Sequence, residues 1–331
     1  MLVLTRADVE SVLDLDALRD AVAAALRELS VGSPSMPPRI AAETPSGGLL
    51  AAMPGSFPEL GALGAKLVAV FPENVDAPTH QAVVVLCDPR TGTPIALVDG
   101  TAITAARTAA ASAVAAQHLA RADATVLTIL GTGVQARAHA DAIPRVCPNL
   151  RELRIAGRSA PRATALAREL DRLDRLDGLD LAITTTTDLA TAITGADIVC
   201  ATTHSPDPVV RREWLRPGVH VSSVGFNTAG REVDADTVRH AIVVVESRAA
   251  VLAPVPAGAN ELLWAIRDGV ITADHIHAEV GELVAGTRPG RTSADQITLY
   301  KSVGVAAEDL AAAQLVVDAA RAGGIGSEIA F

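Results

Sequence analysis

Residues 124–136 read Ala-Thr-Val-Leu-Thr-Ile-Leu-Gly-Thr-Gly-Val-Gln-Ala. An apolar, β-branched run ends at Gly131 and continues into helix-forming sequence, which is typical of the first strand, turn and helix of a dinucleotide-binding sheet. Gly131 would form the tight turn, Gly133 would let the backbone approach a pyrophosphate, and Ala136 would allow close helix packing. The N–H groups and dipole of the helix N-terminus would bind the phosphates. Gly-x-Gly also occurs in ordinary turns, so the flanking sequence has to support this interpretation.

Strands and helices alternate after this stretch, which predicts a parallel, doubly wound sheet of the Rossmann type. Further helices are expected at 134–146, 163–173 and 189–193, and further strands at 153–156, 179–184, 198–202, 220–225 and 242–246. The tail from residue 273 is expected to be mostly helical, with a short strand before Lys301 and a final helix at 306–322.

Upstream of that sheet the sequence has a different pattern. A capping box at Thr5 and an amphipathic run at 15–29 predict two helices. Short β-rich pieces separated by Pro and Gly follow between residues 36 and 97, and they predict an antiparallel sheet. A helix of small residues at 101–119 carries Arg107 among alanines. The predicted fold class is α/β: a doubly wound Rossmann sheet plus an α+β antiparallel-sheet domain.

Composition excludes several classes of function. The 331 residues carry a net charge of −10, so nucleic acid and anionic membranes would be repelled over most of the surface. The N-terminus does not resemble a secretory signal, and no stretch qualifies as a membrane span. Cys87, Cys147 and Cys200 are far apart in or beside apolar runs, which predicts buried thiols in a reducing compartment. We expect a cytoplasmic protein.

Metal and hydrolase chemistry have no residues to support them. The eight histidines are scattered, and His275 and His277 would point apart on a helix. No Gly-x-Ser-x-Gly nucleophile motif is present. We therefore expect no bound metal.

Lysine is rare in this chain. Among the 28 basic residues, only Lys66 and Lys301 are lysines. Chance alone would explain why either one of them is a lysine. Arginine serves equally well where only a positive charge is needed, so a retained lysine suggests an ammonium that can release its proton. Lys66 lies in the apolar strand 64–71, facing either solvent or an interior that would lower its pKa. With Arg39 and Arg107 it would fit an α-amino or α-imino acid, because arginines bind carboxylates through paired hydrogen bonds.

The cofactor preference depends on the residues that follow the strand at 153–156. An acidic residue there binds the ribose of NAD, whereas arginine accommodates the 2′-phosphate of NADP. This chain has Arg158, Ser159 and Arg162 and no carboxylate, which favours NADP(H), with NAD(H) as the alternative. Alternatively, Arg158 is a solvent-exposed arginine at the end of a strand and does not contact the cofactor. Besides Gly131 and Gly133, the residues expected to contact the cofactor are Thr108, Thr132, Val134, Gln135, Thr202, Val224 and Lys301.

Six segments distributed over nearly the whole chain carry a family resemblance. They read Gly64-Ala-Lys-Leu-Val-Ala-Val-Phe-Pro-Glu-Asn, Thr79-His-Gln-Ala-Val-Val-Val-Leu-Cys-Asp-Pro-Arg-Thr-Gly-Thr-Pro, Ile103-Thr-Ala-Ala-Arg-Thr-Ala-Ala-Ala-Ser, Gly131-Thr-Gly-Val-Gln-Ala, Arg288-Pro-Gly-Arg-Thr-Ser and Tyr300-Lys-Ser-Val-Gly-Val-Ala-Ala-Glu-Asp. Their content and order resemble the ornithine cyclodeaminase and mu-crystallin family. The resemblance implies a homodimer in which residues 1–118 with 305–331 bind substrate and mediate dimerisation, and residues 119–304 form the Rossmann dinucleotide-binding domain.

The same resemblance implies roles for individual residues. Lys66 matches the family's substrate-contacting lysine, Arg107 its carboxylate-binding arginine, and Arg39 the arginine after the proline-rich segment. Val303 and Gly304 match a late loop that lies against cofactor and substrate.

One departure from the family bears on the reaction. Family cyclodeaminases place an aspartate shortly after the strand that here ends at Gly225, and Asn227 stands at that position. An amide can position a substrate or water, but it cannot accept a proton as a general base. Either Glu232 or Asp234 could replace the aspartate, or the alignment could be shifted by one residue.

These observations predict NADPH-dependent reduction of a cyclic α-imino acid or ketimine, such as a pyrroline- or piperideine-2-carboxylate, with Lys66 and Asn227 as the catalytic candidates. One alternative is an ornithine or lysine cyclodeaminase that uses bound NAD. Others are an amino-acid dehydrogenase, an opine-type enzyme, and a non-catalytic protein that binds a small ligand together with the nucleotide. The retained Lys66 argues for turnover, because another arginine would be enough to bind a carboxylate.

Overall fold

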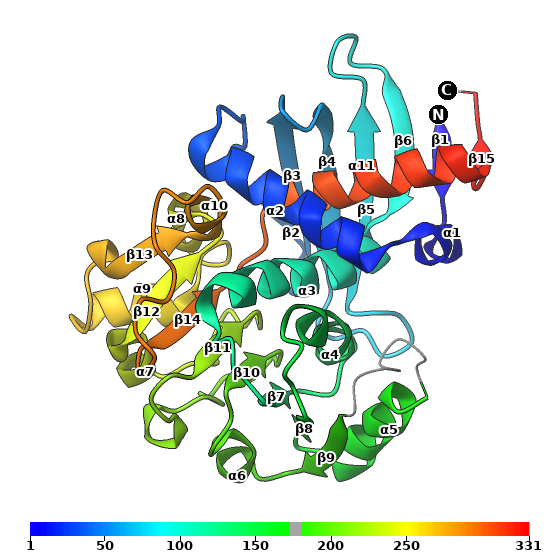
Figure 1. Cartoon of the computed structure of the whole chain (residues 1–331). Helices are drawn as coiled ribbons and strands as arrows, with labels where there is room; N and C mark the ends of the chain where they lie inside the picture. Colours follow the sequence, from blue (N-terminus) through cyan, green and yellow to red (C-terminus); the bar gives the residue numbers. More distant parts are fainter. Residues whose placement is uncertain (173–180, 331) are drawn as a thin grey trace. The chain divides into compact units, whose positions relative to one another are not determined.

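The computed structural model describes residues 1–172 and 181–330 of the chain. Two compact units are formed, one from Met1–Ala111 with Gly304–Phe331 and one from Ser112–Val303. The helix α3 (Gly100–Leu119) runs through the first boundary (Figure 1). The division expected from the sequence has this boundary after residue 118.

The first unit contains a seven-stranded sheet with the order β15-β1-β6-β5-β4-β3-β2. Its strands are β1 (Leu2–Leu4), β2 (Ile40–Glu43), β3 (Leu49–Phe57), β4 (Ala62–Val70), β5 (His80–Cys87), β6 (Pro94–Asp99) and β15 (Ser327–Glu328). Neighbouring strands from β2 to β6 pair antiparallel, as the pattern of short strands and turns predicts. The helices of this unit besides α3 are α1 (Arg6–Val12), α2 (Leu15–Val31) and α11 (Ala306–Gly323). In Figure 1, α11 lies across the sheet next to α2.

The pleat of the central strands separates the two faces of this sheet. Ala51 and Met53 of β3 are buried, and the register places Met53 beside Lys66 and Lys66 beside Val84. Because alternate residues share a face, Lys66 lies on the buried face, which α11 covers. The apolar residues exposed on the opposite face are Ile40, Leu50, Leu67 and Val83.

The second unit is built on an eight-stranded sheet with the order β13-β12-β14-β11-β10-β7-β8-β9, in which every recorded pair is parallel. Its strands are β7 (Val126–Leu130), β8 (Glu152–Ala156), β9 (Ala182–Thr186), β10 (Ile198–Ala201), β11 (His220–Ser223), β12 (Ala241–Val245), β13 (Ile276–Glu279) and β14 (Ile297–Lys301). The α-helices that follow α3 in this unit are α4 (Val134–Val146), α5 (Ala160–Leu170), α6 (Leu189–Ile193), α7 (Ala235–His240), α8 (Arg248–Val251), α9 (Asn260–Arg267) and α10 (Val280–Val284).

The strand order fixes where a ligand would bind in this sheet. From β7 the chain proceeds through β8 and β9 in one direction and through β10 and β11 in the other. Ligands of doubly wound sheets bind outside the carboxyl ends of the strands at this reversal. The predicted Rossmann sheet is therefore confirmed, and its reversal lies beside the glycine turn that follows β7.

Parts of this unit differ from the expected element pattern. The tail expected to be mostly helical contains β13, because alternate residues of this segment are buried against its neighbour β12. The strand expected at 179–184 is observed as β9, and the first part of the expected segment lies outside the described residues. Residue 173, the expected end of the preceding helix, also lies outside them.

Two expectations from composition can be compared with the structure. Cys147 and Cys200 are buried as expected, whereas Cys87 is only half-buried. In the part of the chain that the structure describes, no helix combines the length and the apolar character that crossing a membrane requires.

Candidate functional site

The turn after β7 has the features of a dinucleotide phosphate site. Gly131 has a φ of +121°, and a side chain there would begin 2.6 Å from Thr202 Oγ1, so glycine is required. Thr202 closes the turn by donating its hydroxyl to the Leu130 carbonyl at 2.8 Å. The next helix, α4, begins after Gly133, and no side chain caps it. Its first N–H groups and its dipole can hold a pyrophosphate.

The other residues predicted to contact the cofactor are distributed over both units. Thr132, Val134 and Gln135 belong to the same turn and to the start of α4, and Val134 is 67% exposed. Val224 directly follows β11. Thr108 lies on the part of α3 that belongs to the first unit.

The residues that favoured NADP(H) lie where β8 passes into α5. Arg158 and Arg162 are exposed. The Ser159 side chain caps α5 by accepting the N–H of Arg162 at 3.4 Å. Two guanidinium groups at a helix start can bind a phosphate, because both the charges and the helix dipole attract an anion.

Glu232, in the loop after β11, is a buried acceptor of four hydrogen bonds. Its Oε1 accepts from the Thr203 N–H at 2.5 Å and from the Thr203 hydroxyl at 2.7 Å. Its Oε2 accepts from the Gly225 N–H at 2.7 Å and from the Ser223 hydroxyl at 3.0 Å. Burial raises the pKa of this carboxyl, while Lys301 and the Thr203 hydrogen bonds oppose that shift. The residue therefore joins the ends of β10 and β11.

Lys301 belongs to the same network. Its Nζ donates to the Gly225 carbonyl at 2.9 Å and to the Ser223 hydroxyl at 3.2 Å, and it lies 3.3 Å from Glu261 Oε1. Three acceptors match the three N–H groups of an ammonium. Lys301 thus has an evident role in holding the Glu232 network, and no contact with the cofactor follows from these bonds.

Asn227 is held by one hydrogen bond within its own loop and one to the segment that follows β10. Its Oδ1 accepts from the Ala229 N–H at 2.8 Å, and its Nδ2 donates to the His204 carbonyl at 3.1 Å. Asp234, the other proposed substitute for the family's aspartate, caps α7 by accepting the Thr237 N–H at 2.9 Å. Both Asp234 and Glu232 therefore serve as hydrogen-bond acceptors within the second unit.

Four charged side chains form a buried cluster in the first unit. Lys66 Nζ of β4 lies 2.7 Å from Asp309 Oδ2, and Arg107 Nε of α3 donates to Asp309 Oδ1 at 2.9 Å. Arg107 Nη1 is ion-paired with Glu308 Oε2. All four side chains are at most 5% exposed. The cluster pairs two positive with two negative charges, as burial of charges requires.

The Lys66 ammonium is suited to exchange a proton with a ligand. Burial lowers its pKa to about 8, while Asp309 acts in the opposite direction and Arg107 adds to the lowering. Within residues 1–172 and 181–330, Asp309 is the one protein partner of Lys66 Nζ. An ammonium carries three N–H donors, so this one retains hydrogen-bonding capacity for a ligand.

Gly304 links the two arginines of the predicted substrate site. Its carbonyl accepts a hydrogen bond from Arg39 Nη2 at 2.7 Å. It has a φ of +73°, and a Cβ there would lie 2.8 Å from Arg107 Nη2. Glycine is therefore needed for both its conformation and the close approach of the guanidinium. The preceding residue, Val303, donates its N–H to Glu246 Oε2 at 3.1 Å in the second unit.

The structure brings together four predicted residues of the first unit and adds two that sequence analysis missed. The four are Arg39, Lys66, Arg107 and Gly304. Glu308 and Asp309 lie within a segment that carries the family resemblance, but the sequence predicts no role for them. Acidic residues in the first turn of a helix usually complement the helix dipole. The one sequence feature that could have indicated a site there is the pair of adjacent carboxylates at the start of an alanine-rich helix.

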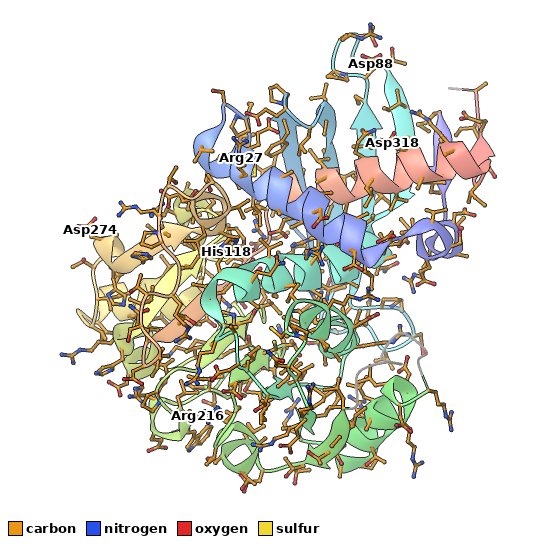
Figure 2. All side chains as sticks on the ribbon, viewed as in Figure 1. Arg27, Asp88, His118, Arg216, Asp274 and Asp318 are labelled. Carbon is orange, nitrogen blue, oxygen red and sulfur yellow. The ribbon has the colours of Figure 1, made fainter. Side chains whose placement is uncertain are left out.

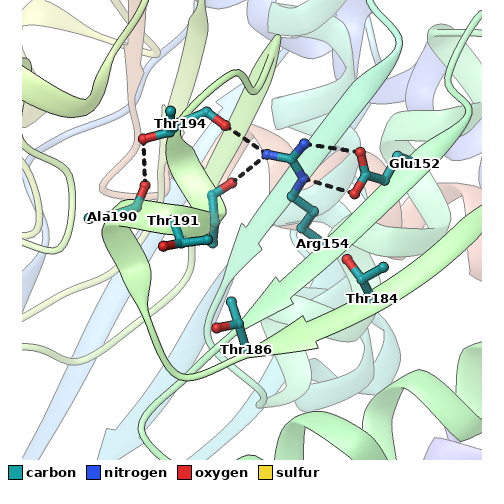
Figure 3. Close-up of a pocket in the computed structure, with 8 residues that line it drawn as sticks. Glu152, Arg154, Thr184, Thr186, Ala190, Thr191 and Thr194 are labelled. Carbon is teal, nitrogen blue, oxygen red and sulfur yellow. Dashed lines mark hydrogen bonds and ion pairs between the residues drawn. The ribbon is translucent and has the colours of Figure 1, made fainter.

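A pocket of about 550 Å³ lies elsewhere, in the second unit (Figure 3). The residues that line it are Glu152, Arg154, Thr184, Thr186, Ala190, Thr191, Ala192 and Thr194. Arg154 donates two hydrogen bonds to Glu152 and one each to the carbonyls of Ala192 and Thr194. Its guanidinium is thereby held by the protein, and the other side chains around it are mostly threonines. We therefore place the candidate chemistry at the glycine turn and the buried cluster.

Comparison with known proteins gives consistent matches over the whole length. The model of the ornithine cyclodeaminase/mu-crystallin family matches residues 1–324. An alanine dehydrogenase of Archaeoglobus fulgidus is 32% identical, over 100% of this chain and 98% of that protein. A Delta(1)-pyrroline-2-carboxylate reductase of Bacillus cereus is 36% identical, over 84% of each.

Solved structures agree with these matches. The Delta(1)-pyrroline-2-carboxylate reductase of Thermococcus litoralis, in complex with NADH and L-proline, is 36% identical with a TM-score of 0.93, over 99% of this chain and 100% of that one. An archaeal alanine dehydrogenase dimer with bound NAD is 31% identical with a TM-score of 0.88. The match covers 100% of this chain and 99% of that one.

Replacement of Glu232 should test its assignment as a structural acceptor. In Glu232→Gln, the amide N–H₂ would face groups that donate to the carboxylate, leaving buried N–H groups without an acceptor. We expect the free energy of unfolding in urea to fall by about 1–3 kcal/mol. The exposed Glu213→Gln is the matched control and should change it by less than about 0.5 kcal/mol. Equal stability of the two variants would contradict the assignment.

Proposed function

This chain belongs to the ornithine cyclodeaminase/mu-crystallin family, and we propose that it reduces the C=N bond of a cyclic α-imino acid of the pyrroline-2-carboxylate type with NAD(P)H. The observation that carries the proposal is the buried Lys66 ammonium paired through Asp309 with the Arg107 guanidinium. The glycine turn after β7 fits the dinucleotide, because Gly131 and the uncapped start of α4 leave backbone N–H groups for its phosphates. Relatives described as pyrroline-2-carboxylate reductases and as ketimine reductase support the substrate class.

Three cationic residues of the first unit have defined tasks in this reaction. Arg107 and Arg39 hold the substrate carboxylate, since guanidinium groups bind carboxylates through paired hydrogen bonds. Lys66 Nζ gives a proton to the nitrogen of the C=N bond, whose carbon takes up a hydride, so that the imine becomes an amine. Bound NAD(P)H supplies that hydride. Orientation of the reactants is the main contribution of the protein.

Cyclodeamination is the less supported alternative. Cyclodeamination needs a group that accepts protons. Asn227 aligns with the family's aspartate, and its amide cannot accept a proton as a general base. The two nearby carboxylates, Glu232 and Asp234, each accept hydrogen bonds from the protein. Reduction of a C=N bond needs a proton donor instead, and Lys66 can act as one.

The decisive assay uses purified wild-type protein with cyclic α-imino acids, pyruvate plus ammonia, ornithine and lysine. We expect oxidation of NAD(P)H with pyrroline-2-carboxylate or piperideine-2-carboxylate and formation of the corresponding cyclic amino acid. If the protein leaves NADPH and NADH unoxidised with every imino acid, yet cyclises ornithine or lysine with catalytic NAD, it is a cyclodeaminase. Turnover confined to pyruvate plus ammonia would make it an amino-acid dehydrogenase.

The pH dependence of the reaction should report on Lys66. Its pKa is lowered to about 8, and reduction needs the protonated form. The rate of imine reduction should therefore fall as the pH rises through about 8, while amine oxidation should gain in the same range. Lys66→Met should lower kcat/KM for reduction by about 10²- to 10⁴-fold and abolish this alkaline limb. Binding of NADH, followed by its fluorescence, should be retained. A Lys66→Met variant with an unchanged pH profile would remove Lys66 from the mechanism.

We also propose a preference for NADP(H) over NAD(H), supported by the exposed Arg158 and Arg162 after β8. Arg158→Ala should raise KM for NADPH about tenfold or more, because a charged hydrogen bond to the 2′-phosphate is lost. KM for NADH should change less than about twofold, and the exposed control Arg239→Ala should alter neither value. Equal effects of Arg158→Ala on both cofactors would argue against a 2′-phosphate contact.

We further propose a homodimer formed by the apolar face of the seven-stranded sheet. Leu50, Leu67 and Val83 are exposed on this face, and a related alanine dehydrogenase was solved as a dimer. Light scattering should give twice the 33.9-kDa chain mass. Leu50→Asp combined with Val83→Asp should give the monomer mass, whereas Val75→Asp, at a position 92% exposed, should not. A monomeric wild type would contradict the proposal.

A further inference from the structure

Asp309 is the one carboxylate of the buried cluster that contacts both cations. Its Oδ2 lies 2.7 Å from Lys66 Nζ, and its Oδ1 accepts from Arg107 Nε at 2.9 Å. The aspartate side chain is fully buried, and Lys66 and Arg107 are 3% and 5% exposed. The reaction described above uses Lys66 and Arg107 directly and leaves Asp309 without a task.

The three residues come from three separate elements of the first unit. Lys66 is on β4, Arg107 is on α3, and Asp309 is in the first turn of α11. Long Lys and Arg side chains have many rotamers, and ordering each of them costs up to about 2 kcal/mol. A carboxylate that contacts both groups removes much of this freedom before a substrate arrives.

A purely structural explanation accounts poorly for this arrangement. A buried ion pair is weak evidence for stability, because desolvation of the charges offsets much of their attraction. A structural pair could also use arginine at position 66, as this chain does at 26 of its 28 basic positions, the other two being Lys66 and Lys301. Retention of a lysine against a buried aspartate suggests that the position of the ammonium and its proton matter.

We propose that Asp309 is a positioning residue that fixes the Lys66 ammonium and the Arg107 guanidinium relative to each other, so that proton donor and carboxylate clamp act on one substrate molecule. The inference rests on the proposed function, because that function gives the two cations their tasks. Glu308 forms a further ion pair with Arg107, at Nη1.

The charges around Lys66 determine what removal of Asp309 would do. The charged groups that act on the ammonium are Asp309 and Glu308 of α11 and Arg107 of α3. Its neighbours across the strands, Met53 and Val84, are apolar. Burial and Arg107 lower the Lys66 pKa, whereas Asp309 and, less strongly, Glu308 raise it. Without the Asp309 charge, the ammonium would lose its proton at a lower pH.

The test compares Asp309→Asn with Asp318→Asn, an exposed position on the same helix that Figure 2 labels. In Asp309→Asn we expect kcat for imine reduction to fall about tenfold or more, since misplaced catalytic groups cost about that much. The alkaline limb of kcat should move to lower pH by about one to three units. Asp318→Asn should leave both unchanged. Asp309→Glu, which keeps the charge, should restore the limb towards its wild-type pH while kcat remains below wild type.

A second measurement observes the lysine without any substrate. The chain has two lysines, so protein labelled with ¹³C at lysine Cε gives two signals by NMR, and Lys66→Met assigns them. The Lys66 signal should titrate near pH 8 in the wild type and at lower pH in Asp309→Asn. This readout does not require the proposed reaction to occur. Failure of the assay together with a shifted titration would therefore overturn the function and leave the contact established.

Defined results would overturn the positioning role. If Asp309→Asn unfolds at lower urea concentration but keeps the wild-type kcat and pH limb, Asp309 is structural. If Asp309→Asn does not fold, Asp309→Glu decides: a kcat equal to wild type, with the Lys66 signal titrating as in wild type, shows that the exact placement of the carboxylate does not matter. A lowered kcat in a folded Asp309→Glu, with NADH binding retained, supports the proposal.

Discussion

A buried ammonium needs a nearby negative charge, and this requirement organises the first unit. Leaving one ion unpaired in the interior costs several kcal/mol. The register of β3, β4 and β5 turns Lys66 towards α11, and the first turn of that helix supplies Asp309. Arg107 of α3 meets the same carboxylate. The start of α11 is therefore tied to the sheet and to α3 by charge as well as by packing.

Lys301, the second lysine, is also buried and paired with a carboxylate, but its N–H groups are all used within the protein. Lys301 has three acceptors, and with Glu232 it joins the ends of β10 and β11 to the loop that follows them. Its donors are used within the protein. Lys66 has one acceptor among the described residues, so its remaining donors can serve a ligand. Burial alone therefore does not separate a structural lysine from a reactive one, whereas the number of its partners does.

Sequence reasoning recovered what depends on local pattern. The apolar run before Gly131 predicted the first strand of a doubly wound sheet, and β-rich pieces upstream predicted an antiparallel one. Scarcity of lysine singled out Lys66, but the alternation within 64–71 left its direction open, because the face that is buried depends on where α11 packs. The contact of Asp309 with Lys66 was missed for the same reason, because a partner distant in sequence is identified only once the strands and helices are packed. The strand β13 was also missed, since a short edge segment has too few residues to show its period.

The distribution of partners also bears on the choice between reduction and cyclodeamination. A reductase needs one positioned proton and a hydride, whereas a cyclodeaminase must also remove protons from an amine substrate. In the second unit, the candidate carboxylates Glu232 and Asp234 accept hydrogen bonds from backbone and hydroxyl groups. The Asn227 amide is hydrogen-bonded to Ala229 and His204. For Glu232 to act as a base it would have to leave four donors, each of which would then need a new acceptor. In the proposed reduction the proton comes from Lys66, whose pKa is lowered to about 8 by burial.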